Sequence, residues 1–215
     1  MTVNMTELET ACRDFMLTTE FADTAHDLSH ILRVVKTAKQ LCAAEGADLE
    51  VVLPAAWLHD CVAVAKNHPD RPIASKLAGD RAVAFLSTLD YPEHKLSAVH
   101  HAIVAHSFSA NVPPDTLEAK VVQDADRMDA LGAIGVSRCM KVGGAIARHL
   151  YHIDDPFCQQ READDKKYTL DHFYIKLLNI AEQMHTQSAK QEAQRRTEFM
   201  RGFLLELGRE IGVPD

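Results

Sequence analysis

The chain has 215 residues, of which 47% are hydrophobic and 25% charged, a composition typical of a globular protein with a sizeable core. Its formal net charge of -8 argues against recognition of nucleic acid through a broad basic surface. The five cysteines are odd in number and never spaced as CxxC, which argues against a zinc ribbon or disulfide scaffold and favours a reducing compartment. The sequence shows neither a signal-peptide pattern nor an apolar run long enough for a bilayer, so we expect a cytoplasmic protein without a membrane partner.

Apolar residues recur at helical spacing along most of the chain. The first stripe ends at Gly46, and the second helix carries Pro54, which we place in its first turn. In chain order, helices are expected at about residues 31–42, 51–59, 78–89, 96–106, 115–129, 132–149 and 189–207. Residues 151–167 are polar and lack a period, and no segment alternates as a strand does. The sequence therefore predicts an all-α, single-domain helical bundle over residues 1–215.

Two histidines lie on the apolar faces of separate predicted helices. His30 precedes Val34 by four residues, and His59 follows Ala55 by four, so both imidazoles point toward the core. Asp60 follows the second histidine directly. A group of carboxylates ends a later helix, at Asp124, Asp126 and Asp129. A single buried histidine is more often an ordinary core residue, but several inward polar groups on different helices predict a metal site, because burying them without partners is costly.

Three segments of the sequence resemble a known family. "AHDLSHILRVV", "AAWLHDCV" and "VVQDADRMDALGAIG" are similar to the three signature blocks of the HD-domain metal-dependent phosphohydrolases, and in particular to their compact single-domain bacterial branch. The resemblance covers about residues 25–150 and implies the HD-type helical fold, with the C-terminal helices at about 170–212 packing on it. It also implies that a divalent metal ion is bound by His30, His59, Asp60 and Asp126.

This mixed nitrogen and oxygen ligand set suits Mn, Mg, Fe, Ni, Co or Zn and does not choose between them. A metal-bound water would attack a phosphate ester or anhydride. The expected substrate is a small phosphorylated metabolite such as a nucleotide. The resemblance implies a dual role for Asp60, which would bind the ion and also accept a proton from the attacking water.

Several neighbouring residues are candidates for catalysis or for substrate binding. His26 is a candidate phosphate contact or general acid, and Asp27 would either orient a ligating imidazole or cap the helix. Lys66 and Arg71 lie in the loop after the His-Asp pair and are candidate phosphate contacts, although a solvated connector explains them equally well.

His106 shares a helix face with Ile103. It is a candidate phosphate contact, a candidate ligand of a second metal, or a buried structural histidine. Asp129 is expected to face the same region as Asp126, in a supporting or capping role. The stripe on the last helix fits either core packing or a homodimer face, so both a monomer and a homodimer remain open.

Two other functions are compatible with the same pattern. A di-iron oxygenase of this fold needs extra inward histidines, of which His106 would supply one, whereas His94, His100 and His101 crowd a single segment. A non-catalytic nucleotide-binding module would use the same pocket, but the presence of all four metal ligands favours catalysis. We therefore expect a phosphohydrolase.

Overall fold

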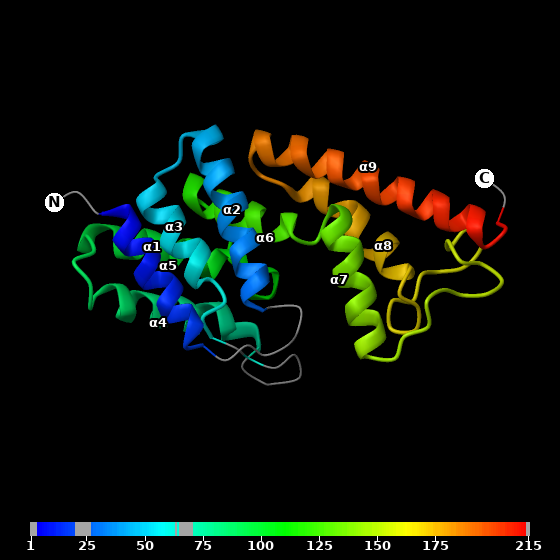
Figure 1. Ribbon diagram of the computed structural model, residues 1–215, viewed down its shortest axis with the longest axis horizontal. Coiled ribbons are helices and arrows are strands. Elements are labelled where there is room, and N and C mark those ends of the chain that lie inside the picture. The colour runs from blue at the N-terminus through cyan, green and yellow to red at the C-terminus, as the bar shows by residue number, and fades with distance from the viewer. Residues whose placement is uncertain (1–3, 20–26, 63, 65–70, 214–215) are drawn as a thin grey trace. The chain divides into compact units, whose positions relative to one another are not determined.

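The computed structural model describes residues 4–19, 27–62, 64 and 71–213. Within these ranges the protein is all-α, with nine α-helices, three short 3₁₀ segments and no strand, as the sequence predicts (Figure 1). A single isolated bridge joins His149 and Tyr168. None of the helices in this part of the chain is long and apolar enough to cross a membrane.

The chain divides into two compact units, residues 1–126 and 127–215. The first contains α1 (Met5–Leu17), α2 (Leu28–Glu45), α3 (Leu49–Leu58), η1 (Arg71–Ile73), α4 (Ala74–Leu86), α5 (Glu93–His106), η2 (Phe108–Ala110) and most of α6 (Leu117–Met128). The second contains α7 (Gly132–Ala145), α8 (Asp171–Ile175), η3 (Leu177–Gln183) and α9 (Gln187–Glu210).

The helices lie where the periodicity predicts them, with three differences, one of which is that the five-residue helix α8 was not predicted. The short helix α1 was not predicted; only Leu8, Cys12 and Met16 are buried on it, which is too narrow a stripe to stand out. Helix α7 ends at Ala145 and not near His149, because Ala147 adopts a positive φ of 55° and the N–H of His149 donates to the carbonyl of Lys167 instead.

Helix α3 is the centre of the first unit. Every residue from Val51 to Leu58 is buried, and the helix packs against α1, α2, α4 and α5 (Figure 1). A helix that is apolar on all sides is stable only when neighbours surround it. Since α3 ends at Leu58, His59 and Asp60 directly follow the most buried helix of this unit.

The prediction that Pro54 lies in the first turn of this helix is wrong. The helix begins at Leu49, so Pro54 is an internal residue and cannot donate to the carbonyl four residues before it, that of Glu50. The hydroxyl of Tyr91 donates to that carbonyl oxygen at 2.8 Å. A buried tyrosine therefore supplies the hydrogen bond that the proline removes.

In the second unit, a buried ion pair organises the long polar segment before α8. Asp171 is fully buried, and its two oxygens accept from Nη1 and Nη2 of Arg161 at 2.6 and 2.7 Å. The backbone N–H of Asp164 donates to the same carboxylate. Burial alone would raise the pKa of Asp171, but the guanidinium and the N–H donor outweigh it and lower that pKa below its ordinary value.

Replacing Tyr91 with Phe is expected to lower the free energy of unfolding by about 1–2 kcal/mol, because the Glu50 carbonyl loses its partner. Pro54→Ala restores a backbone N–H to the same carbonyl. The cost of Tyr91→Phe should therefore be smaller in the Pro54→Ala background. Urea unfolding of the four proteins in a double-mutant cycle measures this difference, and equal costs in both backgrounds would contradict it.

Asp171→Asn is expected to destabilise the protein by about 3 kcal/mol at neutral pH, because it leaves the Arg161 charge without its partner. The folded state has the lower carboxyl pKa. The stabilisation is thus present above the unfolded pKa of about 4 and is lost as the pH falls through the folded value. The stability gap between wild type and Asp171→Asn should close in acid, whereas the exposed Asp90→Asn control should show little gap at any pH.

Candidate metal centre

Two backbone hydrogen bonds hold the central histidines. His30 is the third residue of α2, and its N–H donates at 3.0 Å to Oδ1 of Asp27, the N-cap of that helix. His59 follows the last residue of α3, and its Nδ1 donates to the carbonyl of Ala56 at 2.9 Å. The side chains of both histidines are fully buried. Their rings meet edge to face with centroids 5.5 Å apart.

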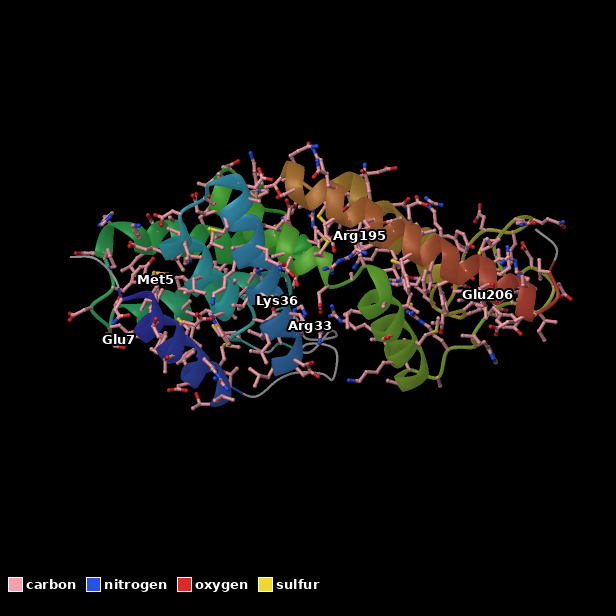
Figure 2. The ribbon with its side chains drawn as sticks, turned by 45° about the horizontal axis from the view of Figure 1, so that its top comes forward. Met5, Glu7, Arg33, Lys36, Arg195 and Glu206 are labelled. Carbon is pink, nitrogen blue, oxygen red and sulfur yellow. The ribbon has the colours of Figure 1, made fainter. Side chains whose placement is uncertain are left out.

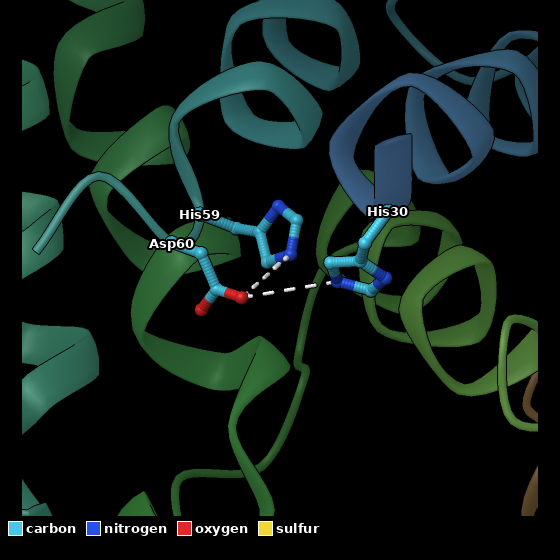
Figure 3. Close-up of side chains that lie close together, drawn as sticks. All are labelled: His30, His59 and Asp60. Atoms are coloured by element: carbon cyan, nitrogen blue, oxygen red, sulfur yellow. Dashed lines mark ion pairs between the residues drawn. The ribbon is translucent and has the colours of Figure 1, made fainter. Parts of the chain in front are cut away.

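Two carboxylates face these imidazoles. Oδ2 of Asp60 lies 3.8 Å from Nε2 of His30 and 3.5 Å from Nε2 of His59 (Figure 3). Oδ1 of Asp126, which comes from α6, lies 3.3 and 3.9 Å from the same two nitrogens. Both carboxylates are partly exposed, at 27% and 28%. The four residues that the family resemblance assigned to a metal are thus brought together, with the carboxylates on the side that solvent reaches.

This arrangement fits a divalent metal ion. One ligand atom each from His30, His59 and Asp60 can be chosen so that all lie within 4.8 Å of one another. Ligand atoms about 2.1 Å from a common ion lie roughly 3–4 Å apart. In addition, Nε2 of His59 is buried and has no hydrogen-bond partner among the described residues. A buried polar atom normally has a hydrogen-bond partner, so a nitrogen that lacks one and faces two carboxylates fits the role of a metal ligand.

The charges of the site favour a ligand-ready state. Burial lowers the pKa of His59, although Asp60 and Asp126 partly oppose this shift, so the ring stays neutral and able to bind a cation. Burial would raise the pKa of Asp126, but its hydrogen bond with His30 and the surrounding imidazoles hold that pKa well below the usual range. The site therefore presents the neutral imidazole of His59 beside the ionised carboxylate of Asp126.

His106 ends α5 at the same place. Its Nδ1 donates to the carbonyl of Ile103 at 2.5 Å, and its Nε2 lies 3.7 Å from Oδ1 of Asp60. The His106 and His59 rings meet at nearly right angles, 4.8 Å apart. Burial lowers the pKa of His106, but the hydrogen bond and charge of Asp60 outweigh it, and the net shift is upward.

The other histidines of α5 face different groups. His94 is exposed, His100 contacts Oδ1 of Asp80 at 2.9 Å, and His101 accepts the N–H of Asp115. Of the four histidines on this helix, His106 is the one that contacts the cluster. The helix thus adds one imidazole to the site, where a di-iron oxygenase would need more.

Sequence reasoning missed one residue that positions the site. Gln123 is buried on α6, and its Nε2 donates to the carbonyl of Ala105 at 2.6 Å. This bond joins the turn of α6 that carries Asp126 to the end of α5 that carries His106. A polar residue between apolar Val121, Val122 and Ala125 was the available signal, since a buried amide needs a partner.

The remaining candidate residues have varied placements. Asp27 is the N-cap of α2, so it has the capping role, which is one of the two roles that the sequence left open. Asp129 belongs to the second unit and is paired at 2.8 Å with Arg138 of α7. His26 and Lys66 lie outside the described residues. Arg71 begins η1, and its side chain lies outside the described part.

Comparison with known proteins identifies the family of the chain. The family model for the HD domain matches residues 27–131, the segment that supplies all four predicted ligands and His106. The chain is also 32% identical to the uncharacterized protein YpgQ of Bacillus subtilis over 190 residues, which cover 86% of this chain and 84% of that protein. The chain therefore belongs to the HD-domain superfamily of hydrolases.

Two solved structures extend the likeness over almost the whole chain. A crystal structure of an HD-superfamily hydrolase from Bacillus thuringiensis matches with a TM-score of 0.75 and 31% identity, covering 99% of this chain and all of the other. The crystal structure of B. subtilis YpgQ in complex with ADP matches with a TM-score of 0.70 and 30% identity, covering 95% and 93% of the two chains. Both units of the present chain thus have counterparts in these relatives.

Asp126→Asn is expected to weaken binding of Mn²⁺ to metal-stripped protein by more than the roughly 100-fold typical of losing a supporting partner, because it removes a charged ligand. Competition with a fluorescent chelator measures the affinity. Asp80→Asn is the matched control, because it removes a carboxylate of α4 that pairs with His100 of α5. This variant should bind Mn²⁺ as wild type does. Equal affinity of wild type and Asp126→Asn would show that Asp126 is not a ligand.

Proposed function

We propose that this protein is a metal-dependent phosphohydrolase that cleaves a phosphate ester or anhydride of a nucleotide. The observation that carries the proposal is the way Asp60 divides its two oxygens. Oδ2 faces His30 and His59, and Oδ1 faces His106. One carboxylate can thereby serve as a ligand through one oxygen and hold a proton at the other.

When bound, a divalent ion lowers the pKa of its water and neutralises charge that develops on a phosphoryl group. The protein's own residues do the rest. We propose that Asp60 Oδ1 accepts the proton of the attacking water. Nε2 of His106, 3.7 Å away, would orient that oxygen or contact the substrate phosphate. Asp126 and the two imidazoles keep the arrangement fixed from three separate helical segments, as preorganised catalysis requires.

Two considerations support a nucleotide as the substrate. YpgQ, which is similar along nearly the whole chain, has been crystallised with ADP. A net charge of -8 would repel a polyphosphate unless a bound cation offset it locally, and a metal centre provides that cation. His26 lies four residues before His30, and Lys66 and Arg71 follow Asp60 by six and eleven residues. We propose these three residues as contacts to the phosphates, with His26 also a candidate general acid.

The test is a phosphohydrolase screen of metal-stripped protein supplied in turn with Mn, Mg, Fe, Ni, Co or Zn. The panel should contain nucleoside mono-, di- and triphosphates, cyclic nucleotides and sugar phosphates, with products identified by chromatography so that ester and anhydride cleavage are distinguished. We expect metal-dependent turnover of at least one nucleotide. Asp60→Ala should lower kcat/KM by more than about 100-fold, because it removes a ligand and a proton acceptor together.

Asp80→Ala serves as the control that removes a carboxylate elsewhere. Calorimetry with ADP, run beside the screen, separates the remaining outcomes. Binding of nucleotide without turnover under any metal would contradict the proposal and favour a nucleotide-binding module. Turnover of sugar phosphates alone would retain the phosphohydrolase and overturn the nucleotide.

A further inference from the structure

The outer face of α9 contains a glycine that nothing in the described chain explains. The core face of this 24-residue helix carries Ala193, Met200 and Leu204, and Gly202 lies on the opposite face. A Cβ placed there would meet no atom of the described chain within 4 Å. Gly208 differs, because a Cβ there would lie 3.2 Å from the Phe157 ring. Glycine is unfavourable inside a helix, so an open one at Gly202 calls for a reason outside the chain.

The residues around Gly202 form a palindrome on the exposed face. In each direction from Gly202, the third residue is apolar, the fourth is acidic and the seventh is basic. These are Phe199 and Leu205, Glu198 and Glu206, and Arg195 and Arg209. All six are exposed, including the two large apolar side chains at 52% and 47%. Offsets of three, four and seven place them on one side of a helix, and Arg195 and Glu206 are labelled on α9 in Figure 2.

A sequence that reads the same in both directions from one residue is suited to an antiparallel copy of itself. A two-fold axis through Gly202 brings each residue level with its mirror position on the other helix, so the same patch serves both partners. We propose that this face of α9, from Arg195 to Arg209, is the surface on which a second copy of this chain docks, with the two α9 helices antiparallel and crossing at Gly202.

The apolar residues fit that pairing. Phe199 of one copy lies level with Leu205 of the second copy, and the two fill one layer side by side, as facing residues do in paired helices. The symmetric layer lies on the other side of the axis. Between the layers the two glycines face each other, and the absence of a Cβ lets the backbones approach closely.

The charges fit as well. In the antiparallel pair, the seam is the line along which the two α9 helices touch. Glu198 lies about one helical turn from Arg209 of the second copy, on the same side of this seam. Arg195 likewise lies about one turn from Glu206 of the second copy. The two-fold axis repeats both pairs, so four ion pairs between the copies flank the apolar layers. Within the single chain, Arg195 pairs with Glu192 at 2.7 Å, Arg209 with Glu206 at 3.1 Å and Arg201 with Glu198 at 3.9 Å, so each charged residue of this face already lies beside one of opposite sign. A parallel arrangement would instead face each residue with its own copy, acid against acid.

One helix face is a small interface, so we expect a reversible, concentration-dependent dimer in the micromolar range. This inference stands independently of the proposed function.

Cysteine cross-linking tests the axis. Gly202→Cys places a thiol on the two-fold axis, and mild oxidation of the full chain should give a covalent dimer in high yield. Gln191→Cys is the matched control on the same helix, also exposed. In the antiparallel pair its two copies lie roughly 33 Å apart along the helices, since each is eleven residues from the axis, and no dimer should form. Efficient cross-linking of Gln191→Cys, or none of Gly202→Cys, would overturn the arrangement.

Charge reversal tests the surface. In sedimentation equilibrium of the full chain, Glu198→Arg and Arg209→Glu should each raise the dimer Kd at least about tenfold, because each faces like charges across the seam. The double variant should recover most of the affinity, since the pairs are restored with opposite polarity. Circular dichroism confirms that the helix is intact in all three. A wild type that stays monomeric at several hundred micromolar, or a double variant no tighter than either single one, would overturn the proposal.

Discussion

Two histidines of the candidate metal centre depend on the same kind of hydrogen bond, from Nδ1 to the carbonyl three residues earlier at the end of a helix. His59 makes it to Ala56 after α3 and His106 makes it to Ile103 at the end of α5. The last carbonyls of a helix lack intrahelical partners, so each helix end supplies an acceptor without distortion. In the neutral ring of His59 the bond fixes the tautomer, because Nδ1 carries the proton and Nε2 is left as the inward-facing nitrogen. Chelation or substrate binding then finds both rings already oriented.

The same end of the bundle shows why the site lies where it does. Helix α3 is enclosed on all sides, so its last residues cannot avoid the interior, yet the carboxylate of Asp60 reaches partial exposure one residue later. The transition from core to solvent therefore occurs within the sequence His59-Asp60. The imidazoles lie on the buried side of the cluster, and the carboxylates lie on the side that solvent reaches. A cation bound between them would be partly desolvated and open to a phosphate ligand, which would suit the proposed hydrolysis better than simple sequestration.

Periodicity predicted the parts of the site that depend on which face of a helix is buried. His30 and His59 were placed inward from their spacing to Val34 and Ala55, and the structure buries both. Properties that depend on contacts between distant segments were not predictable in this way. The proline in α3 is tolerated because of Tyr91, 37 positions later, and Gln123 reaches a carbonyl on another helix. The carboxylate of Asp129 is paired with Arg138, a partner that periodicity along one helix cannot reveal.

Helix α6 links the metal centre to the second unit of the chain. Asp126 is the last residue of the first unit, and from the next residue onward the chain is held by groups of the second. Arg127 donates to the carbonyl of Gln183, Arg196 donates to that of Met128, and Arg138 pairs with Asp129. The carboxylate of Asp126, a proposed metal ligand, thus lies one residue before a helix end at which three arginines make hydrogen bonds.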